Sequence, residues 1–87
     1  MTDENQSEQP LGIRGMLGVG TDAEDGHTRI SRGPRFLLVG GSRDTHEKMQ
    51  HVAVKFNERV DERGKPLEKI NSRELREIVE QVRDDVG

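Results

Sequence analysis

The sequence predicts a small α+β protein, in which a β-hairpin or small sheet is packed by two amphipathic helices in the order β-β-α-(β)-α. Three observations support this class. Four consecutive apolar residues, Phe36–Val39, end at a pair of glycines, as a buried strand ends at a tight turn. Two later segments repeat apolar residues at intervals of three and four, as amphipathic helices do. The chain of 87 residues has room for one small domain.

The first 26 residues differ in charge from the rest of the chain. Residues 1–26 carry six acidic residues and one basic residue, a net charge of −5, whereas residues 27–87 carry a net charge of +2. We therefore predict a disordered or weakly ordered, acidic and glycine-rich leader over 1–26, followed by an α+β domain over 27–87. Residues 1–10 have no apolar residue after the first and are predicted to be disordered.

The segment Leu11–Gly20 is harder to interpret, because glycine recurs among its apolar residues. Two interpretations stay open. The segment is a flexible linker, or Met16–Val19 forms a marginal hairpin with Thr28–Ser31.

The two expected strands lie on either side of a turn. His27–Ser31 alternates in polarity and is predicted to be a strand, and Phe36–Val39, which does not alternate, is predicted to be a strand buried on both faces. Arg32-Gly33-Pro34 has the composition of a turn. A short hairpin is therefore the expected connection.

The first helix is predicted from one apolar stripe. The stripe consists of Met49, Val52, Ala53, Phe56 and Val60. Asp44 is the expected N-cap, with Glu47 at capping-box spacing and with Ser42 and Thr45 as neighbouring alternatives. Gly64 is expected to end the helix, and Pro66 prevents it from resuming.

The remaining segment contains a connection and a second helix. Leu67 and Ile70 are expected to pack in an extended segment or short edge strand; the alternative is a strand parallel to Phe36–Val39, reached by a right-handed crossover. Asn71, with Glu74 three residues later, caps the second helix. The apolar stripe of that helix is Leu75, Ile78, Val79, Val82 and Val86.

The turn after the central strand is a candidate site for an anion. Backbone N–H groups at a helix N-terminus favour phosphate or carboxylate, and nearby arginines can contact phosphates. The candidate binding residues are Arg29, Arg32, Arg35, Gly40, Gly41, Ser42, Arg43 and Thr45. The turn matches neither the P-loop nor G-x-G-x-x-G, so an ordinary capped turn and a solvated basic strand are the simpler interpretation. The acidic leader can also fold back over these arginines and weaken binding.

Catalysis and metal binding have little support in the sequence. His46 and His51 are five positions apart, whereas two zinc-binding histidines on a helix need a spacing of four. There is no cysteine and no nucleophile–base motif. We therefore expect no enzyme activity, no cofactor and no metal.

The predicted function is that of a small non-enzymatic binding protein in the cytoplasm, with a protein partner or a second copy of itself. The core is thin, so a weak homodimer using Val79, Val82 and Val86 of the last helix would bury further apolar surface. The alternative is a nucleic-acid or phosphate-binding module that uses the basic hairpin and the glycine turn. No membrane partner is expected, because no apolar run approaches the ~20 residues of a spanning helix.

Overall fold

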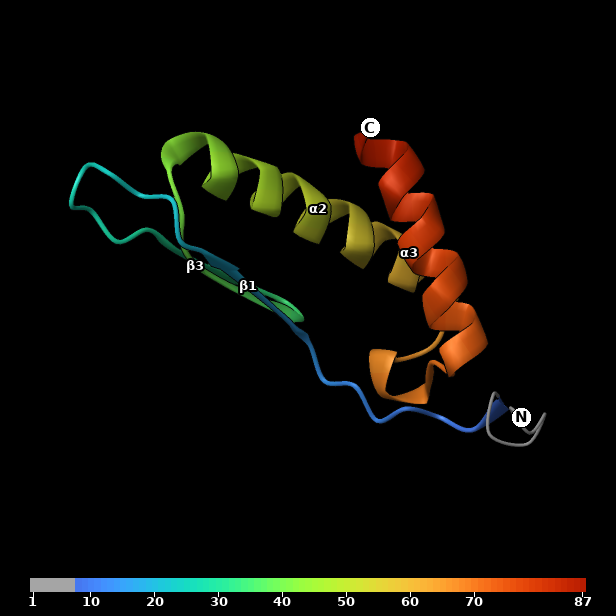
Figure 1. Cartoon of the computed structure of the whole chain (residues 1–87). Helices are drawn as coiled ribbons and strands as arrows, with labels where there is room; N and C mark the ends of the chain where they lie inside the picture. The colour runs from blue at the N-terminus through green and yellow to red at the C-terminus, as the bar shows by residue number, and fades with distance from the viewer. Residues whose placement is uncertain (1–7) are drawn as a thin grey trace, which may run out of the picture. The chain divides into compact units, whose positions relative to one another are not determined.

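The computed structural model describes residues 8–87 and confirms the α+β class, with a three-stranded sheet followed by two helices (Figure 1). The elements are β1 (Met16–Gly20), β2 (Ile30–Gly33), β3 (Phe36–Gly40), α2 (Arg43–Glu62), a 3-10 turn (Leu67–Lys69) and α3 (Ser72–Val86). The chain forms two compact units. The first is Gly15–Val54, and the second joins residues 8–14 to Lys55–Gly87. The predicted disorder of residues 1–10 falls mostly on residues 1–7, outside the described residues.

Strand β3 lies at the centre of the sheet, in the strand order β1-β3-β2. Strands β2 and β3 pair antiparallel, which confirms the predicted hairpin. The first strand runs over Ile30–Gly33, however, and not over the predicted His27–Ser31, so the turn also comes later than predicted. The hairpin turns at Pro34 and Arg35, and Arg35 has a φ of 68°. Position i+2 of a type II turn requires such a positive φ, and proline is common at the position before it.

Strand β1 pairs with β3 in parallel register, so the predicted hairpin between Met16–Val19 and Thr28–Ser31 is wrong. Segment 21–29 connects β1 to β2, which lie at the two edges of the sheet. After the β2–β3 turn, β3 occupies the central position between them. The short edge strand and the alternative parallel strand predicted after the long helix are also wrong, because Leu67–Lys69 is a 3-10 turn. Leu67 and Ile70 are buried, as expected. Part of the segment 1–26 therefore belongs to the sheet.

One face of the sheet packs against the first part of α2. Leu38 of β3 is fully buried, and Gly18 of β1 is its register partner. A Cβ atom at Gly18 would lie 2.8 Å from Leu38 Cδ2 and 3.1 Å from Met49 Sδ. Glycine at this position therefore lets α2 approach the sheet closely.

Helix α2 begins at Arg43, two residues before the start that the predicted N-cap at Asp44 would give. Ser42 is the N-cap, because its Oγ accepts a hydrogen bond from the Thr45 N–H at 3.2 Å. The helix follows the glycine turn directly, which places Asp44 inside the first helical turn. The predicted end is confirmed, with Gly64 at a φ of 70° just after the last helical residues.

The second unit has its own apolar core and a confirmed capping box. Its buried apolar residues are Phe56, Val60, Leu67, Ile70, Ile78 and Val82. The Asn71 side chain accepts a hydrogen bond from the Glu74 N–H at 2.8 Å, and the Glu74 carboxylate accepts one from the Asn71 N–H at 3.1 Å. Leu11 also donates its N–H to the Ile70 carbonyl at 2.9 Å, so the chain before the sheet is tied to this unit. Over residues 8–87, no helix has both the length and the apolar character needed to cross a bilayer.

Candidate binding surfaces

The joint between β3 and α2 brings together most of the predicted anion-binding groups. Gly40 and Gly41 have φ values of 77° and 85°, a region of backbone conformation that favours glycine. The turn they form leaves the Ser42 N–H free of the sheet and places the Ser42 and Thr45 hydroxyls beside it. These three donors converge at the positive end of the helix dipole.

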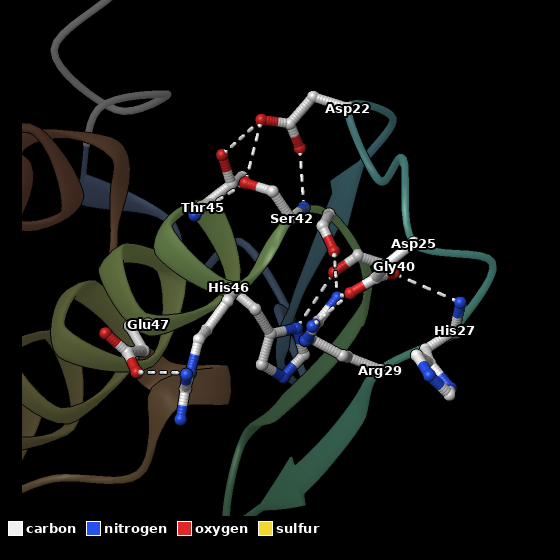
Figure 2. A network of polar contacts seen from close by, with 11 residues as sticks. Asp22, Asp25, His27, Arg29, Gly40, Ser42, Thr45, His46 and Glu47 are labelled. Carbon is white, nitrogen blue, oxygen red and sulfur yellow. Dashed lines mark hydrogen bonds and ion pairs between the residues drawn. The ribbon is translucent and has the colours of Figure 1, made fainter.

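The carboxylate of Asp22 already occupies this position (Figure 2). It accepts hydrogen bonds from the Ser42 N–H at 2.7 Å, the Ser42 hydroxyl at 3.1 Å and the Thr45 hydroxyl at 2.6 Å. These donors favour the charged carboxylate, and the Thr45 hydroxyl, followed by the Ser42 N–H, lowers the pKa of Asp22 to about 2. An external anion would therefore have to displace a side chain of the protein itself.

A second carboxylate from the same segment pairs with the nearest arginine (Figure 2). Asp25 forms an ion pair with Arg29 at 2.6 Å, and Arg29 also donates to the Gly41 carbonyl at 3.2 Å. The Arg29 guanidinium, followed by the His27 N–H, lowers the pKa of Asp25 to about 2. Arg29 thus ties the segment 21–29 to the glycine turn, and its charge is neutralised.

The other predicted arginines are spread over separate parts of the unit. Arg43 is exposed and lies 3.8 Å from Glu47 on the same helix. Arg35 lies in the hairpin turn, at the opposite end of β3 from the glycine turn. Arg32 is exposed on β2. The structure therefore does not gather the four arginines beside the Ser42 and Thr45 donors.

His46 has a structural position that the sequence analysis missed. The residue is 5% exposed; Nδ1 lies 2.9 Å from the Gly40 carbonyl oxygen, and Nε2 lies 2.7 Å from the Ser31 hydroxyl. A carbonyl oxygen can only accept, so Nδ1 donates to it and, in the neutral ring, Nε2 accepts from Ser31. Its spacing of three and seven residues to Met49 and Ala53 places it on the apolar stripe, and this signal could have identified it.

The Ser31–His46 pair has the geometry of a nucleophile and a base, but its surroundings favour a structural role. Gln50 also donates to the Ser31 hydroxyl at 2.8 Å. The nearly complete burial of His46 leaves little room for a substrate beside the ring. The three side chains therefore connect β2 and β3 to α2. His51 is exposed, and residues 8–87 contain no group of three His, Cys, Asp or Glu side chains placed to hold a metal ion.

The opposite face of the sheet is aliphatic and open. Residues that alternate with Gly18, Ser31 and Leu38 point away from α2. Register places them in two rows across the sheet: Val19, Val39 and Ile30, then Leu17, Leu37 and Arg32. Leu17, Val19 and Ile30 are 66%, 61% and 65% exposed. We call the five aliphatic residues Leu17, Val19, Ile30, Leu37 and Val39 the outer sheet face.

The outer sheet face qualifies the prediction that Phe36–Val39 is buried on both faces. Leu38 is the only buried residue of that run. Leu37 and Val39 are half-buried between exposed neighbours of the adjacent strands. Within residues 15–54 the only helix is the first part of α2, and it covers the other face. The apolar composition of β3 is therefore typical of a strand that is covered on both faces, but within residues 15–54 no element covers the outer sheet face.

The predicted interface residues of α3 do not form one exposed stripe. Val82 is 6% exposed and belongs to the core of its own unit. Val79 is 54% exposed, and Val86 is half-buried. Among residues 8–87, the largest set of adjacent exposed aliphatic residues is instead on the sheet.

Comparisons of the chain with protein-family models, curated proteins and solved structures find no match. Of the two surfaces described above, the outer sheet face is open, whereas the glycine turn is occupied by Asp22.

Proposed function

We propose that this is a non-enzymatic binding protein that associates with a protein surface through the outer sheet face. The observation that carries the proposal is the pair of aliphatic rows across β1, β3 and β2, with three residues more than 60% exposed. The largest apolar patch on a typical monomer covers about 300–600 Å², and such patches are often functional. Antiparallel sheets commonly solvate one face, but that face is then polar.

The available energy indicates a modest affinity. Burying the exposed parts of Leu17, Val19 and Ile30 contributes roughly 1–2 kcal/mol each. Association itself costs at least about 4 kcal/mol in lost freedom of motion. The apolar contact therefore only about offsets the lower bound of this cost, and polar contacts at the rim decide the final affinity.

The phosphate or nucleic-acid alternative has weaker support. Asp22 takes the donors of the glycine turn, and Asp25 neutralises Arg29. The chain also lacks Trp and Tyr, whose rings stack on bases. A salt titration with a generic RNA separates the two functions: the phosphate-binding alternative requires binding that weakens steeply with salt, and the proposed function requires none.

Affinity capture from a lysate of the native host tests the proposal with a matched pair of variants. Val19 and Val54 are both exposed valines of the first unit, but only Val19 lies on the outer sheet face. We expect Val19→Lys to lose the proteins that the wild type captures and Val54→Lys to retain them. Identical capture by both variants would contradict the proposal, as would a wild type that captures no protein and also fails to bind a second copy of itself.

A further inference from the structure

We infer that the partner of the outer sheet face is a second copy of this chain, packed sheet against sheet about a two-fold axis. The inference rests on the proposed function and specifies its partner. In such an interface the same patch serves both copies, so it must be complementary to itself. The outer sheet face meets this condition because aliphatic residues of β1 and β2 lie on either side of Leu37 and Val39 of the central strand β3.

The size of the patch fits a weak dimer. The exposed fractions of Leu17, Val19 and Ile30, with smaller contributions from Leu37 and Val39, correspond to roughly 300–400 Å² of apolar surface per copy. Two copies would bury roughly 600–800 Å² of apolar surface, and a stable interface buries about 1,200–2,000 Å² in total, of which about 65% is apolar in homodimers. The face therefore supplies most of the apolar centre of an interface at the small end of that range.

Charge at the two ends of the face selects the direction of packing. Arg32 is the one charged residue in the two rows, and it occupies the corner beside Leu37. Glu24 lies in the segment that joins β1 to β2, beyond the row of Val19, Val39 and Ile30. Glu24 is exposed and has no ion-pair partner among residues 8–87.

A two-fold axis across the strands turns the second sheet end for end. Register then places Arg32 of one copy over Ile30 of the other, at the end of the sheet where Asp22, Glu24 and Asp25 lie, and the negative charge of these residues attracts it. An axis along the strands would instead place Arg32 over Leu17 of the second copy, at the end of the sheet away from these carboxylates. The geometry therefore points to antiparallel packing of the two sheets.

Sedimentation equilibrium over a concentration series, from about 10 μM to about 1 mM in view of the small interface, tests the inference. We expect the wild type and Val54→Lys to change from the 9.8 kDa monomer to a dimer as concentration rises. Val19→Lys should weaken the dimer at least tenfold, with an unchanged far-UV spectrum because Val19 is exposed in the monomer. A wild type that stays monomeric would overturn the inference, as would a dimer that Val19→Lys leaves intact.

A charge exchange tests the direction of packing and does not depend on disrupting the apolar face. Arg32→Glu and Glu24→Arg should each weaken the dimer several-fold, and the double variant should restore it. Additive losses in the double variant would overturn the antiparallel arrangement. A monomeric wild type that still captures a different protein, in a manner sensitive to Val19→Lys, would refute self-association alone; loss of both behaviours would refute the proposed function as well.

Discussion

Replacement of Gly40 by alanine tests the parallel pairing of β1 with β3, on which the outer sheet face depends. Gly40 is the register partner of Gly20 at the end of this pairing. Its φ is 77°, and a Cβ atom there would lie 2.5 Å from the Gly20 carbonyl oxygen. Alanine at this position therefore meets two separate penalties.

The magnitudes of the two penalties follow from the backbone and from the contact. An L-residue in the left-handed region costs roughly 1–2 kcal/mol. A carbon atom 2.5 Å from a backbone oxygen must be relieved by moving one strand away from the other, and such overpacking costs typically ~1–3 kcal/mol. We expect Gly40→Ala to lower the free energy of unfolding by about 2–5 kcal/mol, a large share of the ~5 kcal/mol available to a small domain.

Two other glycines of the same unit separate the penalties. Gly26 has a φ of 75° with nothing within 4 Å of its Cβ position, so Gly26→Ala meets only the backbone penalty. Gly20 has no positive φ, but its Cβ would lie 2.5 Å from the Gly41 Cα, so Gly20→Ala meets only the contact penalty. Gly40→Ala should cost more than either.

Urea unfolding followed by far-UV circular dichroism measures these differences, because the chain has no Trp or Tyr for fluorescence. Site-resolved amide exchange adds a local measurement, in which the β1 amides should lose protection in Gly40→Ala and Gly20→Ala but keep it in Gly26→Ala. A Gly40→Ala variant that costs no more than Gly26→Ala would show that β1 does not lie against β3. Leu17 and Val19 would then not belong to the outer sheet face.

Three further predictions concern the core, the helix cap and the carboxylate at the glycine turn. Phe56→Ala should lower the free energy of unfolding in urea by ~3–5 kcal/mol, because Phe56 is 8% exposed and lies in the core of the second unit; a variant that unfolds at the wild-type urea concentration would contradict this position in the core. Asn71→Ala should cost ~1–2 kcal/mol, and Asn71→Asp, which keeps an acceptor for the Glu74 N–H, should cost less; equal losses would argue against the cap. The lowered pKa of Asp22 means that its stabilisation is fully present above its ordinary pKa of 3.8 and is lost as pH falls through about 2. Carboxyl-detected NMR should give a midpoint near 2, rising toward 3.8 in Thr45→Val, and a wild-type midpoint near 3.8 would refute the contact.

The sequence by itself determined the features that depend on residues close together in the chain. The Asn71–Glu74 capping box needs only a spacing of three, and the structure contains both of its hydrogen bonds. The β2–β3 hairpin needs only two neighbouring strands and a turn with proline. Such features were predictable because their energies are set within a few residues.

The candidate sites were only partly predictable. The glycine turn and its hydroxyl donors were correctly placed together, because Gly40 to Thr45 are contiguous. That Asp22 fills this position could not be deduced, because it comes from a segment 20 residues earlier whose path depends on the sheet. His46 could have been assigned to the packed stripe by its spacing, but its hydrogen bond to Ser31 required the position of β2.

Only the tertiary structure decided which strand lies beside which and which sheet face stays open. The glycine-rich segment Met16–Gly20 has little local preference for a partner strand. Its parallel pairing with β3 depends on the free edge of β3, the one that does not pair with β2 in the hairpin. That pairing places Leu17 and Val19 beside Leu37 and Val39 and makes one continuous aliphatic surface from two segments. A short apolar run predicts a strand that is buried on both faces. The layers that cover each face, however, come from distant parts of the chain or from another molecule.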